Sequence, residues 1–213
     1  MKIIVFDTET TGLPKKRRGL IEDDKNWPHM IQLAWLVVEG RKISKHASYI
    51  IKLGGNQKIP EASTKIHKIT NEDMDLYGVD IKGVLEDFMS DLNNSTLLVA
   101  HNLKFDYTII KVELFRNKMF KEMEQLKEPK GYCTMLKAYD KYKLRSPRTG
   151  KIVRKYPKLS ELYKLLFADK LNNDILHDAL IDSLVCLRCF YRMRFNIDIK
   201  NDDFIWRAFM SRT

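Results

Sequence analysis

The stretch KIIVFDTETTGLP, residues 2–14, decides the fold because an apolar run ends there on two carboxylates, Asp7 and Glu9. Its first five residues are mostly β-branched or aromatic and predict a short buried strand. In an extended strand, side chains two residues apart point the same way, so Asp7 and Glu9 face one side together. Two adjacent carboxylates repel each other unless a proton or a cation lies between them. A solvated strand end, a glycosidase carboxylate pair and a cation site all remain open at this point.

Composition and charge indicate a globular protein with an excess of positive charge. The chain has 213 residues and 44% hydrophobic content, which are ordinary values for one globular domain. Lys and Arg outnumber Asp and Glu by 38 to 28, which gives a formal charge of +10. Such an excess indicates a polyanionic partner, either nucleic acid or an anionic membrane, or a solvated basic surface.

The sequence predicts an intracellular protein without a membrane segment. No run approaches the roughly 18 apolar residues of a span, and the start lacks the pattern of a secretory signal. Cys133, Cys186 and Cys189 are too few and too unevenly spaced for a disulfide framework. The pair in CLRC has zinc-like spacing without a second Cys/His pair, so we expect buried thiols.

Apolar periodicity predicts a mixed α/β domain in which helices cover a sheet. Further strands are expected over residues 30–40, 42–53 and 96–100, with a turn at Gly40. Helical spacing is found over residues 61–70, 80–92, 101–115, 133–142, 159–167 and 178–195.

Two later stretches bring further acids. Asp106 follows the strand at 96–100 and lies one turn into the next helix, from which a carboxylate can reach the carboxyl ends of the strands. His177 and Asp182 are five residues apart, an offset of about 140° on a regular helix, so they would not share a helix face. The geometry works if His177 precedes the helix, Asp178 is its N-cap and Asp182 projects from the first turn.

The ordered motifs FDTETTGL, HNLKFD and HDALID resemble the three exonuclease motifs of the DnaQ-like superfamily, DEDDh branch. IHKIT at 66–70 is similar to the recurrent I-H-G-I-T of that family, and YCTM to the segment after its second motif. The resemblance spans residues 2–190 and implies an RNase H-like fold with a mixed five-stranded sheet. We expect one exonuclease domain over 1–213, with a C-terminal extension, 196–213, packed on its core.

The resemblance also implies a chemistry. Asp7, Glu9, Asp106 and Asp182 would hold two Mg²⁺ or Mn²⁺ ions, because oxygen-only ligands select hard cations. His177 would take a proton from the water that attacks the terminal phosphodiester. The product would be a 5′-nucleoside monophosphate.

Substrate contacts are expected at family-like positions, namely Thr10, Thr11, Gly12, Leu13, His67, Asn102 and Phe105. For the first four a plain turn is the alternative, and a buried core aromatic explains Phe105 equally well. His101 is left out of the catalytic set, because a histidine that ends a buried strand often makes only structural hydrogen bonds.

The leading hypothesis is a metal-dependent 3′→5′ exonuclease that acts on single-stranded or mismatched DNA ends. An exoribonuclease of the same fold and a noncatalytic nucleic-acid-binding module are the alternatives. Single-stranded nucleic acid, DNA before RNA, is the expected substrate, and a polymerase or replication protein an expected partner. Two basic groups would track phosphates: Lys15, Lys16, Arg17 and Arg18, and Arg145, Arg148, Lys151, Arg154 and Lys155 in the basic loop 145–158.

Overall fold

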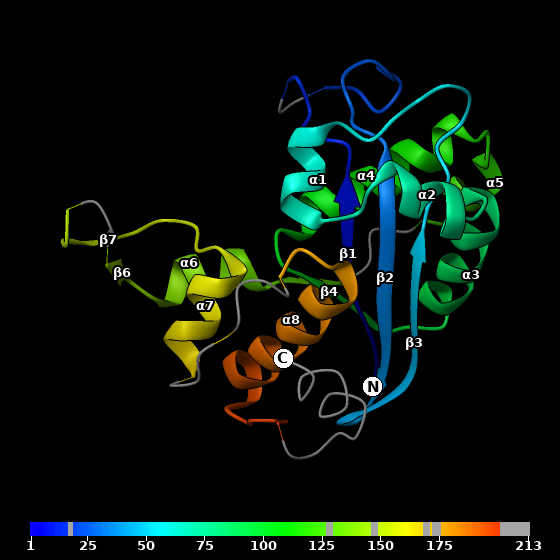
Figure 1. Ribbon diagram of the computed structural model, residues 1–213. Coiled ribbons are helices and arrows are strands. Elements are labelled where there is room, and N and C mark those ends of the chain that lie inside the picture. The colour runs from blue at the N-terminus through cyan, green and yellow to red at the C-terminus, as the bar shows by residue number, and fades with distance from the viewer. Residues whose placement is uncertain (17–18, 127–129, 146–148, 168–170, 172–175, 201–213) are drawn as a thin grey trace.

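A computed structural model describes residues 1–16, 19–126, 130–145, 149–167, 171 and 176–200 (Figure 1). Its main sheet has five strands in the order β3-β2-β1-β4-β5. They are β1 (Lys2–Thr10), β2 (Met30–Glu39), β3 (Lys42–Ile50), β4 (Leu97–Ala100) and β5 (Gly131–Cys133). The first three strands pair antiparallel, whereas β4 runs parallel to β1 and β5 parallel to β4. The expected mixed five-stranded sheet is confirmed, as is the turn at Gly40, whose φ is 64°.

Helices cover both faces of this sheet. They are α1 (Glu61–His67), α2 (Asn71–Tyr77), α3 (Ile81–Asn93), α4 (Leu103–Arg116), α5 (Phe120–Gln125), α6 (Thr134–Lys141), α7 (Leu159–Leu166) and α8 (Ala179–Phe195). Figure 1 shows α8 crossing one face of the sheet, beside α7, while α3 and α4 lie behind the other face. A small hairpin, β6 (Leu144–Arg145) and β7 (Ile152–Val153), projects beyond α6 and α7.

The apolar side chains of β1 point alternately into two clusters of the hydrophobic core. Ile3 and Val5 pack with the apolar residues of α8, whereas Ile4 and Phe6 pack with those of α3 and α4. All four side chains are fully buried. Because β1 is covered on both faces, its apolar run is continuous.

Two local differences from the sequence-based expectation have clear causes. The helix predicted over 61–70 ends at His67, since Lys68 adopts a left-handed conformation with φ 66°. Thr70 then caps α2 through a reciprocal capping box with Asp73. The helix predicted from Cys133 begins one residue later, because Cys133 ends the short strand β5. All three cysteines are free and buried, as expected.

The chain after α8 is described as far as Lys200. Ile199 is fully buried in the α8-side core, and Asp198 accepts two hydrogen bonds from the guanidinium of the buried Arg188. Residues 201–213 of the expected C-terminal extension lie outside the described residues, as do Arg17, Arg18 and Arg148. Among the described helices, none has the length and apolar character needed to cross a membrane.

An aromatic cluster on the α3 side offers a test of the packing. Phe88 is fully buried, and its ring centroid lies 5.4 Å from those of both Phe6 and Trp35. We expect Phe88→Ala to lower the free energy of unfolding by about 3–5 kcal/mol, because it removes a buried ring and leaves a cavity. Phe120→Ala is the control, since Phe120 is 51% exposed. Chemical denaturation measures both changes, and equal losses in the two variants would contradict this packing.

Candidate active site

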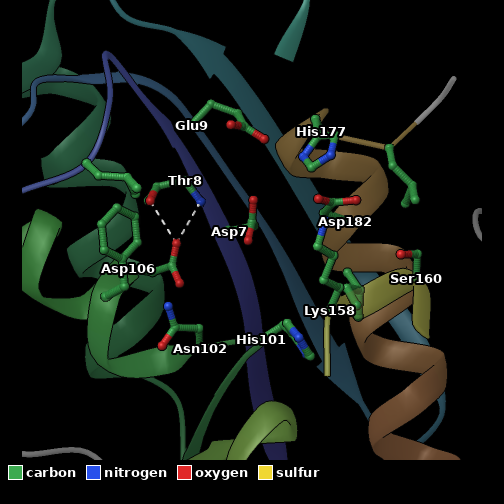
Figure 2. A pocket seen from close by; sticks show the side chains of 14 residues that line it. Asp7, Thr8, Glu9, His101, Asn102, Asp106, Lys158, Ser160, His177 and Asp182 are labelled. Carbon is green, nitrogen blue, oxygen red and sulfur yellow. Dashed lines mark hydrogen bonds between the residues drawn. The ribbon is translucent and has the colours of Figure 1, made fainter. Parts of the chain in front are cut away.

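The carboxyl end of β1 meets the first turns of α4 and α8, and a cleft of about 730 Å³ opens at this junction. Figure 2 shows the acids on opposite sides of the cleft, with Asp7 and Glu9 on β1, Asp106 on α4 and Asp182 on α8. All four acids predicted from the motifs, together with His177, therefore line one cavity.

The alternation of β1 directs its polar side chains. Asp7 and Glu9 share the odd-numbered face with Ile3 and Val5, which is the face that α8 covers. Thr8 points the other way, toward α4. The strand continues through both acids to Thr10, with a register shift relative to β2 between Glu9 and Thr10. Strand β1 thus contributes polar side chains to both sides of the cleft.

Asp106 is held in place by Thr8. Its carboxylate accepts hydrogen bonds from the Thr8 hydroxyl at 2.8 Å and the Thr8 backbone N–H at 3.2 Å. The chain enters α4 through Asn102, which adopts a left-handed conformation with φ 70°. Asn tolerates this conformation better than most residues, so the turn can bring Asp106 directly over the end of β1.

The start of α8 has the geometry predicted from the spacing of its polar residues. His177 lies before the helix with φ 70°, Asp178 is the N-cap, and Asp182 is in the first turn. One Asp178 carboxylate oxygen accepts from the backbone N–H groups of Leu180 and Ile181. The other accepts from the Gln32 amide, whose oxygen in turn accepts from the N–H of Ala179. Asp178 therefore anchors α8 to β2.

The four clustered carboxyl groups are held partly in their neutral form. Burial, followed by repulsion from neighbouring carboxylates, raises the pKa of Asp7 far above its ordinary value and that of Glu9 to about 9. Burial also raises the pKa of Asp106 to about 7, although the hydrogen bonds from Thr8 oppose the shift. The pKa of Asp182 rises to about 7 for the same reason. Among the described residues, no cation pairs with any of the four acids.

This donor set fits a divalent metal. Ligand atoms of Glu9, His177 and Asp182 lie within 4.8 Å of one another. The Oδ1 atom of Asp182 is buried without a hydrogen-bond partner, which is costly for a carboxylate oxygen in a cavity. A metal ion would satisfy that oxygen and offset the repulsion.

The imidazole of His177 is kept neutral. Partial burial, then the positive charges of Lys158 and Lys68, lower its pKa below the ordinary value. A neutral imidazole beside acidic groups is suited to accept a proton.

The expected substrate contacts divide into two groups. Leu13, Asn102 and Phe105 line the cleft, and Leu13 is 82% exposed. Thr10, Thr11 and Gly12 do not line it: the Thr10 hydroxyl donates to the carbonyl of Gly12, and the Thr11 hydroxyl accepts from the N–H of His29. These hydrogen bonds shape the turn that presents Leu13.

His67 also lies outside the cleft lining. Its Nδ1 accepts from the N–H of Ile69, and its Nε2 is buried without a partner. Burial, and then the charge of His177, lower the pKa of His67 to about 4.

The sequence reasoning missed several cleft residues. His101 lines the cleft with one ring nitrogen on the Thr134 hydroxyl and the other on the carbonyl of Pro157. Its hydrogen bonds agree with the structural role expected for it. Lys158, the N-cap of α7, and Ser160, in the first turn of that helix, also line the cleft. Of the residues that were missed, only the position of Thr8 could have been predicted from the sequence. Alternation along the strand places its side chain on the face opposite Asp7 and Glu9.

Comparison with known proteins identifies the family. The exonuclease family model RNase_T matches residues 4–190. The chain belongs to this exonuclease family. The resemblance to DnaQ-like enzymes is confirmed. The chain is 26% identical over 214 residues to a DNA polymerase III subunit epsilon of Buchnera aphidicola, with 94% of this chain and 81% of the relative covered.

Two further matches are partial. A PolC-type DNA polymerase III of Mycoplasmopsis pulmonis is 30% identical over 121 residues, which is 56% of this chain and 8% of the polymerase. The structure of E. coli Exonuclease I with a dA16 oligonucleotide matches 92% of this chain with a TM-score of 0.65 at 15% identity. The chain spans only 41% of that enzyme. The structural match confirms the expected RNase H-like fold.

The raised pKa values predict an unusual pH dependence without metal. Carboxyl groups titrate near pH 4 when unfolded, whereas Asp106 and Asp182 titrate near 7 and Glu9 near 9 in the fold. The folded state binds more protons between these values, so the contribution of these groups to stability is complete below about pH 4. In chelator, we expect it to be lost as pH rises through 7 to 9. Thermal unfolding over this range measures the effect.

Mg²⁺ should reverse this loss. Binding at 100 times its Kd would add about 2.7 kcal/mol, or roughly 5–11 °C in Tm. Asp182→Asn should flatten the pH dependence in chelator and reduce the gain from Mg²⁺. Asp75→Asn, at an exposed carboxylate on α2, is the matched control and should change neither. A wild-type Tm indifferent to Mg²⁺ at pH 8 would rule out a metal site here.

Proposed function

We propose that the chain is a metal-dependent 3′→5′ exonuclease that removes nucleotides from single-stranded or mismatched DNA ends. The observation that carries the proposal is the group of four mutually repelling carboxyl groups beside the neutral His177, with a buried Asp182 oxygen left without a partner. A noncatalytic binding module has no need of such a costly cluster. The family membership supports hydrolysis of phosphodiesters.

Asp7, Glu9, Asp106 and Asp182 are the proposed ligands of two Mg²⁺ or Mn²⁺ ions. Carboxylates are the donors that these hard cations prefer. When bound, the ions would cancel the acidic charge that otherwise repels a phosphate and would polarise its oxygens.

His177 is the proposed general base. Its neutral imidazole would take a proton from the water that attacks the terminal phosphorus atom. The bond from phosphorus to the 3′ oxygen of the preceding nucleotide breaks, and that oxygen takes a proton to become the new 3′-hydroxyl. A 5′-nucleoside monophosphate leaves.

The apolar wall of the cleft supports attack at a strand end. Leu13 and Phe105 line the cavity beside the acids, where they can pack against a terminal base, and Asn102 offers an amide for hydrogen bonding. We favour DNA over RNA as the substrate for two reasons. One relative is a DNA polymerase III subunit epsilon, and one structural neighbour was determined with a dA16 oligonucleotide. The epsilon relative also supports a polymerase as partner.

Digestion of labelled DNA tests this proposal. We expect stepwise release of nucleoside monophosphates from the 3′ terminus of a single strand in Mg²⁺, and no release in chelator. A 3′-phosphate should slow the reaction, and circular single strands should resist it. Asp7→Asn should lower turnover by 10²-fold or more, because the variant loses a proposed metal ligand, while Asp75→Asn keeps full activity. Efficient cutting of circles would point to an endonuclease.

The role of His177 can be separated from metal binding. We expect His177→Ala to keep binding of single strands yet lose about 10²-fold or more in kcat. Since the pKa of His177 is lowered, the wild-type rate should stay high at pH 6.5 and fall only at more acidic pH, where the imidazole becomes protonated. His46→Ala, at an exposed histidine of β3, is the control. A variant with normal kcat and the wild-type pH profile would remove His177 from the mechanism.

A further inference from the structure

The described residues between α6 and α7 form a basic projection, here called the basic arm and defined as residues 144–145 and 149–157. Figure 1 shows its β6–β7 hairpin standing away from the main sheet, beyond α6 and α7. The stretch LRSPRTGKIVRKYPK, residues 144–158, holds three arginines, three lysines and no acidic residue. None of the residues proposed above for catalysis lies in the arm.

The base of the arm is fixed to the cleft. The carbonyl of Pro157 accepts a hydrogen bond from His101 at 3.0 Å, and both His101 and the next residue, Lys158, line the cleft. The Lys155 ammonium pairs with Glu161 of α7, which also accepts from the N–H of Lys158. The path from the arm into the cleft is therefore held by hydrogen bonds and an ion pair.

The arm presents an aromatic platform. The rings of Tyr139 and Tyr156 stack with centroids 4.5 Å apart and an interplanar angle of 29°. Tyr139 belongs to α6 and supports one face of the Tyr156 ring, yet Tyr156 remains 55% exposed. Two residues of extended chain span about 7 Å, so Tyr156 stands next to the cleft wall formed by Lys158.

Two exposed cations precede Tyr156 within five residues of sequence. Lys151 and Arg154 are both exposed, and neither forms an ion pair with another described residue. Ile152, between them, is 64% exposed. Exposed cations on the same short segment as an exposed, supported aromatic ring are a combination that binds single-stranded nucleic acid without reading its sequence.

We propose that the basic arm is a second binding site for single-stranded DNA, in which a base upstream of the 3′ terminus stacks on Tyr156 while Lys151 and Arg154 contact phosphates. The site would hold the strand as it leaves the cleft past Lys158. The choice of DNA and the direction of the strand rest on the function proposed above. The description of the stacked rings and the exposed cations does not depend on that proposed function.

Stacking is tested by comparing long and short substrates. For an oligodeoxythymidylate of about sixteen nucleotides, we expect Tyr156→Ala to raise KM about tenfold or more, the scale of losing one stacked base. Its kcat, and both constants for a dinucleotide, should stay unchanged because a dinucleotide cannot fill the cleft and the arm together. Tyr156→Phe keeps the ring and should behave as wild type. Tyr77→Ala, at an exposed tyrosine of α2, is the control.

Charge is tested by salt dependence. Each phosphate contact to a single strand adds about 0.7 to the slope of log K against log salt concentration. Lys151→Gln with Arg154→Gln should lower the slope by roughly 1.4 for the long strand. Lys82→Gln, at an exposed lysine of α3, should leave it unchanged. Equal slopes in wild type and the double variant would overturn the phosphate contacts.

Binding in chelator separates this inference from the proposed exonuclease activity. Fluorescence anisotropy of the labelled long strand should show the Tyr156→Ala loss even when nothing is cleaved, so an inactive wild type would not remove the arm site. A Tyr156→Ala variant that lowers Tm but leaves affinity and KM unchanged would show that the Tyr139–Tyr156 stack is structural only. That result would overturn the inference and leave the exonuclease proposal standing.

Discussion

Mutual repulsion among four clustered carboxyl groups is the constraint on which the site depends. Asp7, Glu9, Asp106 and Asp182 converge on one cleft, and burial raises the pKa of each, with a further rise from neighbouring carboxylates. Folding must hold the four groups together against this repulsion. It must also offset the free-energy cost of removing water from each carboxylate. A continuous apolar core on both sides of β1 supplies the stability that offsets it.

The contacts around the acids show how the fold holds them. The hydroxyl and N–H of Thr8 bind Asp106, and the N-cap carboxylate of Asp178 joins the start of α8 to Gln32 of β2. Beside these hydrogen-bonded groups, the buried Oδ1 of Asp182 has no hydrogen-bond partner among the described residues. Four carboxyl groups held close together in this way fit a cation, which would replace the protons that their raised pKa values favour.

Much of this arrangement was predictable from local patterns. Strand alternation placed Asp7 and Glu9 on one face, and the five-residue spacing of His177 and Asp182 favoured a helix with Asp178 as its N-cap. Strand β5, with three residues, is too short for a periodic signal. The end of α1 at Lys68 was also missed, because a left-handed lysine carries no cap signature of the kind that glycine gives. Residues 201–213 of the expected extension lie outside the described structure.

The sequence by itself determined the order of the motifs, the acids that they carry and the alternation that aims them, since these follow from spacing along the chain. Only the tertiary structure decided that Lys158 and His101 join the cleft, that Thr10 and Thr11 turn away from it, and that Tyr139 supports Tyr156 beside it. The physical reason is that the first group depends on local backbone geometry. The second depends on where loops far apart in sequence pack against the sheet, and no local pattern encodes that packing.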